Sequence, residues 1–339
     1  MTLDILLFVA GVALAGLTLR DVFDTVVVPG GSRASLRVTH RLRVALLPLW
    51  KSMRRWRTGI SGAFAPVILV SSFIIWMSLL ALGFGLMAYA VRAHFNPPLR
   101  SFGDAVYLVG SALVTVGLSE SNPFGAGRWI ILAAGFCGLG VMTMAVTYLL
   151  EVQSGISRRD AAIIKLNTSA GDPPSALTLL ERFAAIRNRH ELLETMKEGR
   201  NWCATVRQSH SAHPSLIYFQ STSTGAGWPA AVGAMLDLAL IAEHLIDDDE
   251  LYGPAVLLHE DGARMARELA LVIGLSPVAP RTLGPEVDQL TERLRTSGYP
   301  LRENPNHLAI ARQRADYMSC VDALAEHLGR PTTALIRQA

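Results

Sequence analysis

The stretch SFGDAVYLVGSALVTVGLSESNP at residues 101–123 decides how this chain folds. Ser101, with Asp104 three residues later, forms a capping box, which predicts that a helix begins here. The helix can continue only to about Val114, which is too short to cross a bilayer. We therefore expect a re-entrant half-helix that is followed by non-helical backbone at residues 115–117.

Two charge-free stretches flank this segment. Residues 58–91 contain no Asp, Glu, Lys or Arg, and residues 129–150 are equally free of charge. A helix needs about 20 apolar residues to cross a bilayer, so both stretches are long enough. Over the whole chain only 17 % of residues are charged, against about 25 % in soluble proteins. Because irregular backbone at membrane depth needs a cover of protein or water, residues 115–117 should lie inside an assembly.

A third apolar run occupies residues 5–19. A signal peptide is one interpretation, but it would need a positively charged start and a small-residue cleavage site. Here the only early charge is Asp4, and the run ends at Arg20. We therefore interpret the run as a further membrane-spanning helix, and we expect Asp21 and Asp24 beyond it to pair with neighbouring arginines.

Residues 31–59 form a basic segment without an acidic residue. Its charges alternate with leucines and tryptophans, which predicts an amphipathic helix on anionic lipids with tryptophan at headgroup depth. The basic residues are Arg33, Arg37, Arg41, Arg43, Lys51, Arg54, Arg55 and Arg57. Nucleic acid is the other partner that such a run attracts, but a place between two spans argues against it. Because short basic loops stay cytoplasmic, we expect the N-terminus outside and residues 155–339 in the cytosol of a multi-pass protein of the cell inner membrane.

The residues after the half-helix suit an ion filter. A cation filter stacks rings of carbonyl oxygens that replace the hydration shell of the ion. One chain supplies one carbonyl at each level, so a ring of four requires a homotetramer about a cyclic axis. Successive carbonyls point the same way only if left- and right-handed backbone alternate, which glycine allows at low cost. The half-helix would direct its partially negative C-terminus at a cation in the central cavity.

Here the sequence resembles a known family. Residues 115–120 (TVGLSE), with Pro123 after them, are similar to the potassium-channel signature with its trailing acid and proline. The resemblance to the two-helix potassium-channel pore covers roughly residues 64–152, and more loosely the chain to about residue 245 resembles bacterial channel-like proteins with an extra first helix. It implies a selectivity filter for the monovalent cations K⁺ and Na⁺ that consists of Thr115, Val116, Gly117, Leu118 and Ser119.

Two residues depart from the filter pattern of the family. The family has glycine where Ser119 stands, and left-handed backbone costs a non-glycine residue about 1–2 kcal/mol. We therefore expect the outermost carbonyl ring to be turned or absent. Leu118 replaces the usual tyrosine and cannot hydrogen-bond behind the filter. Both changes predict weak discrimination of potassium over sodium, and Ser119 leaves open a non-conducting scaffold that signals through its cytosolic part.

The third span carries the expected gate. Gly138 matches the gating-hinge glycine of the family, although glycine there also permits tight helix packing. The resemblance implies that the inner cavity is lined by Leu139, Met142, Val146 and Leu150. All four are apolar, which predicts a gate that closes by dewetting; ordinary lipid contact is the alternative. Four copies of Glu120 would form an acidic ring at the outer mouth, unless the carboxylate bonds to the half-helix backbone.

From about residue 155 the chain reads as a soluble, helical sequence. Its periodicity predicts an all-α bundle with helices at residues 176–187, 191–209, 230–245, 263–273, 285–296 and 308–328. Its 19 basic and 22 acidic residues do not favour nucleic-acid binding. We interpret the acidic run at residues 247–250 as a solvated loop.

Two histidines in this part are weak candidates for metal binding. His210 and His213 are three residues apart, but a metal site needs further ligands, so a structural role is the simpler interpretation. No Ser/His/Asp arrangement stands out, and an enzyme tethered to the membrane has no support beyond scattered histidines. We expect no enzyme activity, no cofactor besides the permeating cations, and a cytosolic ligand or partner of unknown nature.

These observations predict an all-α membrane protein in four parts: an N-terminal transmembrane helix (1–30), a basic interfacial helix (31–59), a pore module with outer helix, pore helix, filter and inner helix (60–154), and an α-helical cytosolic domain (155–339). The predicted function is a homotetrameric channel for monovalent cations. It would gate at the inner helix and be modulated by the cytosolic domain.

Overall fold

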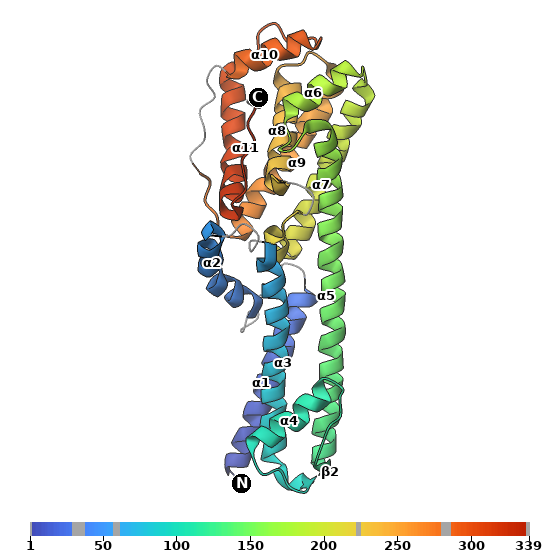
Figure 1. Ribbon diagram of the computed structural model, residues 1–339, viewed down its shortest axis with the longest axis vertical. Helices are drawn as coiled ribbons and strands as arrows, with labels where there is room; N and C mark the ends of the chain where they lie inside the picture. Colours follow the sequence, from blue (N-terminus) through green and yellow to red (C-terminus); the bar gives the residue numbers. More distant parts are fainter. Residues whose placement is uncertain (1, 29–37, 57–61, 222–224, 279–285, 337–339) are drawn as a thin grey trace. The chain divides into compact units, whose positions relative to one another are not determined.

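The computed structural model describes residues 2–28, 38–56, 62–221, 225–278 and 286–336. Its chain divides into two compact units, Met1–Val152 and Gln153–Ala339, each of them helical (Figure 1). Three helices in the described part are long and apolar enough to cross a membrane: α1 (Thr2–Val26), α3 (Phe64–Ala90) and α5 (Ala126–Ala170). The predicted all-α fold is confirmed.

Helix α1 packs antiparallel against α3 through small residues. A Cβ atom at Gly11 would lie 2.5 Å from the carbonyl oxygen of Gly83, so the two backbones meet where neither has a side chain. At one end of the pair, Arg92 Nη1 lies 2.7 Å from Asp4 Oδ1. Small residues permit the close van der Waals packing that associates helices in lipid.

The capping box predicted from the sequence is present. The Asp104 N–H donates to Ser101 Oγ at 3.1 Å, and the Ser101 N–H donates to Asp104 Oδ2 at 2.9 Å. The helix that follows, α4 (Phe102–Leu113), has 12 residues and a length of about 18 Å. Its predicted start and length are therefore confirmed.

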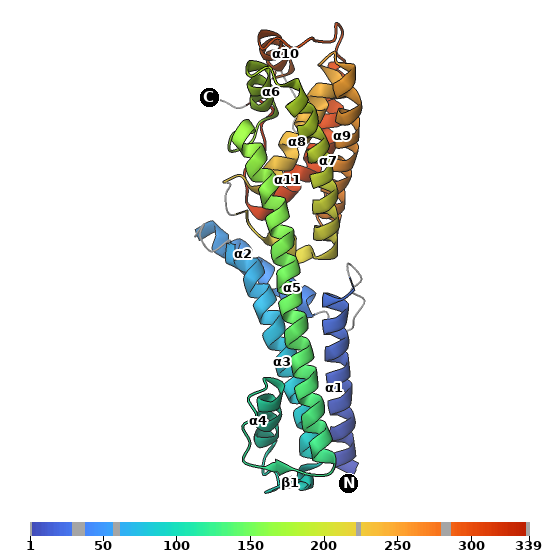
Figure 2. The same cartoon turned by 90° about the vertical axis from the view of Figure 1, so that its right-hand side faces the viewer.

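Helix α4 is held at one end of the first unit. It packs against α3, and Figures 1 and 2 show it as a short helix beside the much longer α3 and α5. The turn η2 (Arg92–His94) leads into β1 (Phe95–Asn96), which pairs antiparallel with β2 (Asn122–Pro123). This small ribbon joins the two connections on either side of α4.

The basic segment contains helix α2 (Val38–Trp56), as predicted, whereas Arg33, Arg37 and Arg57 lie outside the described residues. Trp50 is buried and stacks on Phe64 with ring centroids 4.7 Å apart, so the chain itself covers this ring. Its position at headgroup depth stays a prediction. Among the side chains of α2 that the structure describes, the exposed large hydrophobic ones are Val44 and Leu49.

Helix α5 is longer than the predicted span of residues 128–150. It continues to Ala170 because no proline interrupts the chain before Pro173. Its final residues belong to the second unit.

The second unit surrounds a buried central helix. Its elements are α6 (Ala176–Ala185), α7 (Arg189–Ala212), η3 (Pro214–Tyr218), α8 (Gly227–His244), α9 (Asp249–Val272), α10 (Glu286–Thr296) and α11 (His307–Leu328). Every residue of α8 from Gly227 to Ala242 is buried, and α6, α7, α9 and α11 pack against it (Figure 2). A helix that is apolar on all sides belongs at such a centre. Its one buried carboxylate, Asp237, pairs with Arg314 Nε at 2.8 Å and accepts a bond from the Tyr317 hydroxyl at 2.6 Å.

The prediction of a solvated loop at residues 247–250 is confirmed only in part: Asp247, Asp249 and Glu250 are exposed, but Asp249 and Glu250 already belong to α9. Asp248 caps the start of α9, because its Oδ1 accepts from the Glu250 N–H at 3.0 Å. Its Oδ2 also accepts from Arg189 Nε at 2.6 Å. A capping carboxylate satisfies donors that a helix start leaves unpaired. Helix α9 therefore begins 14 residues earlier than the residue 263 expected from periodicity.

Candidate functional site

The candidate filter follows directly from the end of α4. The Val116 N–H donates to the Ser111 carbonyl at 2.9 Å, and the Thr115 N–H donates to the Ala112 carbonyl at 3.0 Å. These two bonds form a Schellman motif, whose left-handed position is usually glycine and here is Thr115, with φ of 60°. The N–H groups of Thr115 and Val116 therefore bond to carbonyl groups in the last turn of α4.

Left- and right-handed backbone alternate through the first filter residues. Thr115 and Gly117 have φ of 60° and 73°, and Val116 between them has no positive φ. In the part of the chain that the structure describes, no donor reaches the carbonyl oxygens of residues 115–118. The stretch therefore presents a short row of main-chain oxygens that are available to another ligand.

Ser119 interrupts this alternation. Its φ is not positive, and its hydroxyl donates to the Ser121 carbonyl and accepts from the Ser121 N–H at 3.1 Å. Leu118 is 57 % exposed, so the chain itself covers less than half of this side chain. Glu120 is exposed, and within the described residues it makes no bond to the α4 backbone.

Gly138 lies where α4 rests on α5. A Cβ atom at this position would lie 2.0 Å from the carbonyl oxygen of Leu113, the last residue of α4. Only glycine leaves room for this contact. The packing role considered for Gly138 thus has a direct structural basis, and bending at this glycine stays a prediction.

The four residues expected to line the inner cavity share an exposed face of α5. The exposed fractions are 55 % for Leu139, 43 % for Met142, 59 % for Val146 and 65 % for Leu150. Phe136, on the same face, is 77 % exposed. A single chain leaves this apolar face uncovered, so lipid or further copies of the chain must cover it.

His210 has the surroundings of a core residue. It is fully buried; its Nε2 lies 3.3 Å from Arg159 Nη1 and its Nδ1 lies 3.1 Å from Ser209 Oγ. Arg159, also buried, pairs with Asp160 at 2.9 Å. Among the residues with described positions, no group of three or more His, Cys, Asp or Glu could hold a metal, and His213 joins no such group.

The buried position of His210 predicts a loss of stability in acid. Burial, together with the Arg159 charge, holds the pKa of His210 well below its usual value. Below about pH 6.5 the unfolded chain therefore binds a proton that the folded chain does not, so stability falls as the pH decreases from that value. We expect His210→Asn to flatten the decline of the melting temperature between about pH 7 and pH 5. The exposed His190 provides the control: His190→Asn should keep the wild-type slope, and an unchanged slope in His210→Asn would contradict the prediction.

One structural contact in the first unit was missed by sequence reasoning. Asp24 pairs with Arg20 at 3.7 Å as predicted, but Asp21 does not pair with an arginine in the described structure. Instead Asp21 is fully buried and accepts from Trp76 Nε1 at 2.9 Å and from the Val38 N–H at 3.1 Å. It thereby ties α1 to α3 and to the start of α2. No local pattern connects residues 55 positions apart.

Comparison with known proteins agrees with this geometry. A family model described as "Ion channel" matches residues 67–154, which include α4 and the candidate filter. Protein LctB of Geobacillus stearothermophilus is 32 % identical over 114 residues, which are 34 % of this chain and 77 % of that protein. Protein LctB of Bacillus caldotenax is 30 % identical over 112 residues, 33 % of this chain and 75 % of that protein. No solved structure matches the chain significantly. The matched residues and the three apolar helices show that this chain is a membrane protein that belongs to the ion channel family.

Proposed function

We propose that four copies of this chain form a channel for monovalent cations, with a filter made by the carbonyl oxygens of residues 115–118. The observation that carries the proposal is the row of unbonded carbonyls at the end of a half-helix, with left-handed backbone at Thr115 and Gly117. Irregular backbone at membrane depth must be covered by protein or water, and one chain leaves this segment exposed. Four copies about an axis would cover it and complete each carbonyl ring.

Selectivity in this proposal is weak. Ser119 uses its hydroxyl in a local turn, so its carbonyl does not continue the alternating row. Leu118 has no hydroxyl to fix the pore diameter. The outer ring then holds potassium less specifically, while a ring of four Glu120 carboxylates concentrates cations at the outer mouth.

The topology proposed for the channel places the N-terminus outside, and the second unit in the cytosol, in a multi-pass protein of the cell inner membrane. The antiparallel α1 and α3 are consistent with two successive spans. The exposed Val44 and Leu49 of α2, between the basic Arg41 and Lys51, suit contact with anionic lipids on the cytosolic side. The second unit modulates the channel and is not an enzyme.

The gate in this proposal is the apolar face of α5, which excludes water when four copies approach one another. Val146→Asn or Leu150→Asn should keep the closed pore wet and raise its open probability, because dewetting needs an apolar lining. Single-channel recording measures this directly. Val146→Ile keeps the lining apolar and should leave the open probability unchanged. Equal open probabilities in Val146→Asn, Leu150→Asn and the wild type would contradict a dewetting gate.

Recording from the full chain in a planar bilayer tests the proposed function. With potassium at unequal concentrations on the two sides and sodium balancing the total salt, we expect a cation current whose reversal potential lies between zero and the potassium equilibrium value. A reversal at the potassium equilibrium value would contradict weak selectivity. Absence of current would contradict the channel and favour the non-conducting scaffold that Ser119 suggests.

A further inference from the structure

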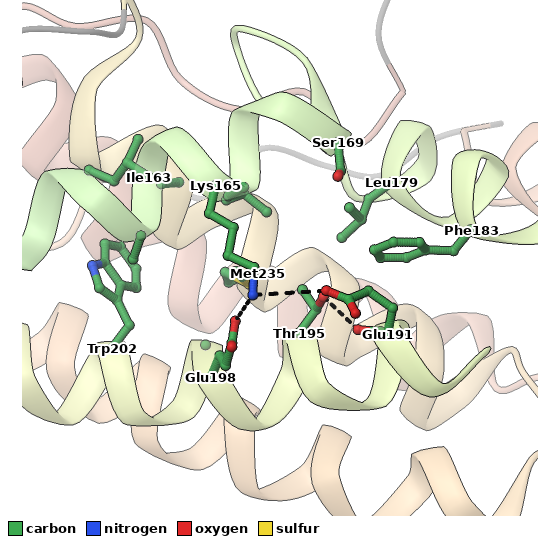
Figure 3. Close-up of a pocket in the computed structure, with 14 residues that line it drawn as sticks. Ile163, Lys165, Ser169, Leu179, Phe183, Glu191, Thr195, Glu198, Trp202 and Met235 are labelled. Atoms are coloured by element: carbon green, nitrogen blue, oxygen red, sulfur yellow. Dashed lines mark hydrogen bonds and ion pairs between the residues drawn. The ribbon is translucent and has the colours of Figure 1, made fainter. Parts of the chain in front are cut away.

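A pocket opens between α5, α6, α7 and α8 in the second unit (Figure 3). The cavity itself has a volume of about 60 Å³, and the space becomes about 530 Å³ when the open solvent in front of it is included. The pocket is therefore a small cavity behind an open mouth, where most of a ligand would lie. Its apolar walls consist of Ile163, Leu166, Leu179, Phe183, Trp202 and Met235. Trp202 Nε1 donates to the Arg159 carbonyl at 3.1 Å, so the indole ring is held in place before any ligand binds.

Three charged side chains lie together at the exposed side of this pocket. Figure 3 shows Lys165 extending from α5 toward Glu198 and Glu191 of α7. Lys165 Nζ is 2.6 Å from Glu198 Oε2 and 3.8 Å from Glu191 Oε1. The bond to Glu198 raises the pKa of Lys165, so the ammonium stays charged at neutral pH. Two carboxylates therefore share one ammonium, and the cluster carries one negative charge in excess.

We propose that this pocket binds a small organic cation, a primary amine on a flat aromatic or short aliphatic body. The body would lie in the mouth of the pocket against the apolar wall, and the apolar area that it buries there would add to the affinity. The amine would bond to Glu191 and Glu198, whose charge Lys165 only half neutralises. An anionic ligand of the same shape would find two carboxylates and an ammonium that is already paired.

A bound cation would act on the helix that carries the candidate gate. Ile163 and Leu166 in the pocket wall belong to α5, which also contains Val146 and Leu150. A ligand that contacts α5, α6 and α7 together would stabilise the channel state in which the pocket has this shape, and would shift the equilibrium between open and closed states toward it. This regulatory effect rests on the proposed channel function, whereas binding does not.

Calorimetric titration of the full chain in lipid nanodiscs tests the site, with empty nanodiscs as the blank. Tryptamine and indole-3-propionate serve as probes, because they share a ring and carry opposite charges. We expect tryptamine to bind at least tenfold more tightly. Glu191→Gln and Glu198→Gln should weaken its binding severalfold, and Lys165→Met, which leaves both carboxylates unpaired, should strengthen it. Tighter binding of indole-3-propionate, or the reverse order of the variants, would overturn the proposal.

The control variants for this titration lie on α7, the helix that also carries Glu191 and Glu198. Arg200, 2.6 Å from Asp261, forms an ion pair of the same kind outside the pocket, so Arg200→Met should leave tryptamine binding unchanged. Thr195 lines the pocket and Thr205 does not, yet both hydroxyls bond to the carbonyl four residues earlier. Thr195→Phe should abolish binding and Thr205→Phe should keep it. Binding that survives Thr195→Phe would place the ligand elsewhere.

Cation flux into liposomes tests whether binding at this pocket changes conduction through the channel. Tryptamine should change the flux of the wild type and of Thr205→Phe but not that of Thr195→Phe. An effect that persists in Thr195→Phe would be block of the pore itself and would overturn the regulatory part. Binding without any change in flux would overturn it as well. A wild type that passes no cations would contradict the proposed function, while the titration would still decide whether the pocket binds.

Discussion

Gly117→Asp should abolish cation flux through the reconstituted chain. Gly117 has φ of 73°, a conformation that costs a residue with a side chain about 1–2 kcal/mol, and a tetramer incurs that cost four times. Four carboxylates would also stand beside the carbonyl oxygens that hold the ion. Among the described residues, no atom lies within 4 Å of the Cβ position, so a steric clash with them does not explain a loss. Potassium uptake into proteoliposomes should fall more than tenfold.

Alanine variants isolate the backbone conformation from the added charge. Gly16 of α1 also has open space around its Cβ position, but its φ is not positive. We expect Gly117→Ala to reduce uptake more than tenfold and Gly16→Ala to leave it near the wild-type rate. Equal uptake by the two alanine variants would show that left-handed backbone at Gly117 has no part in conduction.

Gly138→Ala should destabilise the first unit and stop conduction. The added Cβ would lie 2.0 Å from the Leu113 carbonyl oxygen, a backbone atom that can move only if the end of α4 moves. Overpacking of this kind costs about 1–3 kcal/mol, so we expect the apparent melting temperature to fall by roughly 5 °C or more. Because the candidate filter starts two residues after Leu113, flux should fall too. Thermal unfolding in detergent and liposome flux measure the two effects.

Gly140→Ala is the control for this prediction. Gly140 lies two residues further along α5, and no atom of the described residues is within 4 Å of its Cβ position. This variant should keep the wild-type melting temperature. The comparison also separates packing from hinge bending at Gly138. A hinge alone predicts lost flux with unchanged stability, whereas the contact with Leu113 predicts the loss of both. Wild-type stability of Gly138→Ala would contradict the packing role.

The parts of the fold that the sequence predicts are those encoded locally. Ser101 and Asp104 specify the start of α4 through two short bonds, and long charge-free runs specify the apolar helices. The second half of α5 and the first half of α9 were not predicted. Polar and charged residues follow the apolar span in α5, and in α9 Gly253 and Pro254 are residues that usually interrupt a helix, although Pro254 lies inside this one. The capping role of Asp248 depends in part on Arg189, 59 positions away, which no local pattern reveals.

The sequence predicted which residues form the candidate site, but it predicted less of their backbone conformation and contacts. The motif at residues 115–120 indicated where carbonyl oxygens would be exposed, and Gly117 indicated one left-handed position. Left-handed Thr115 was not foreseen, because it follows from the way α4 ends and not from the residue type. The contact of Gly138 with Leu113 and the pocket beside Lys165 both depend on tertiary packing between helices, so they appear only in three dimensions.

A structure of the full chain in a lipid bilayer with potassium tests the channel proposal most directly. We predict four copies about one axis, with the carbonyl oxygens of residues 115–118 directed at that axis and ion density between them. An assembly in which residues 115–118 point away from the symmetry axis, toward lipid or bulk solvent, would contradict the proposal.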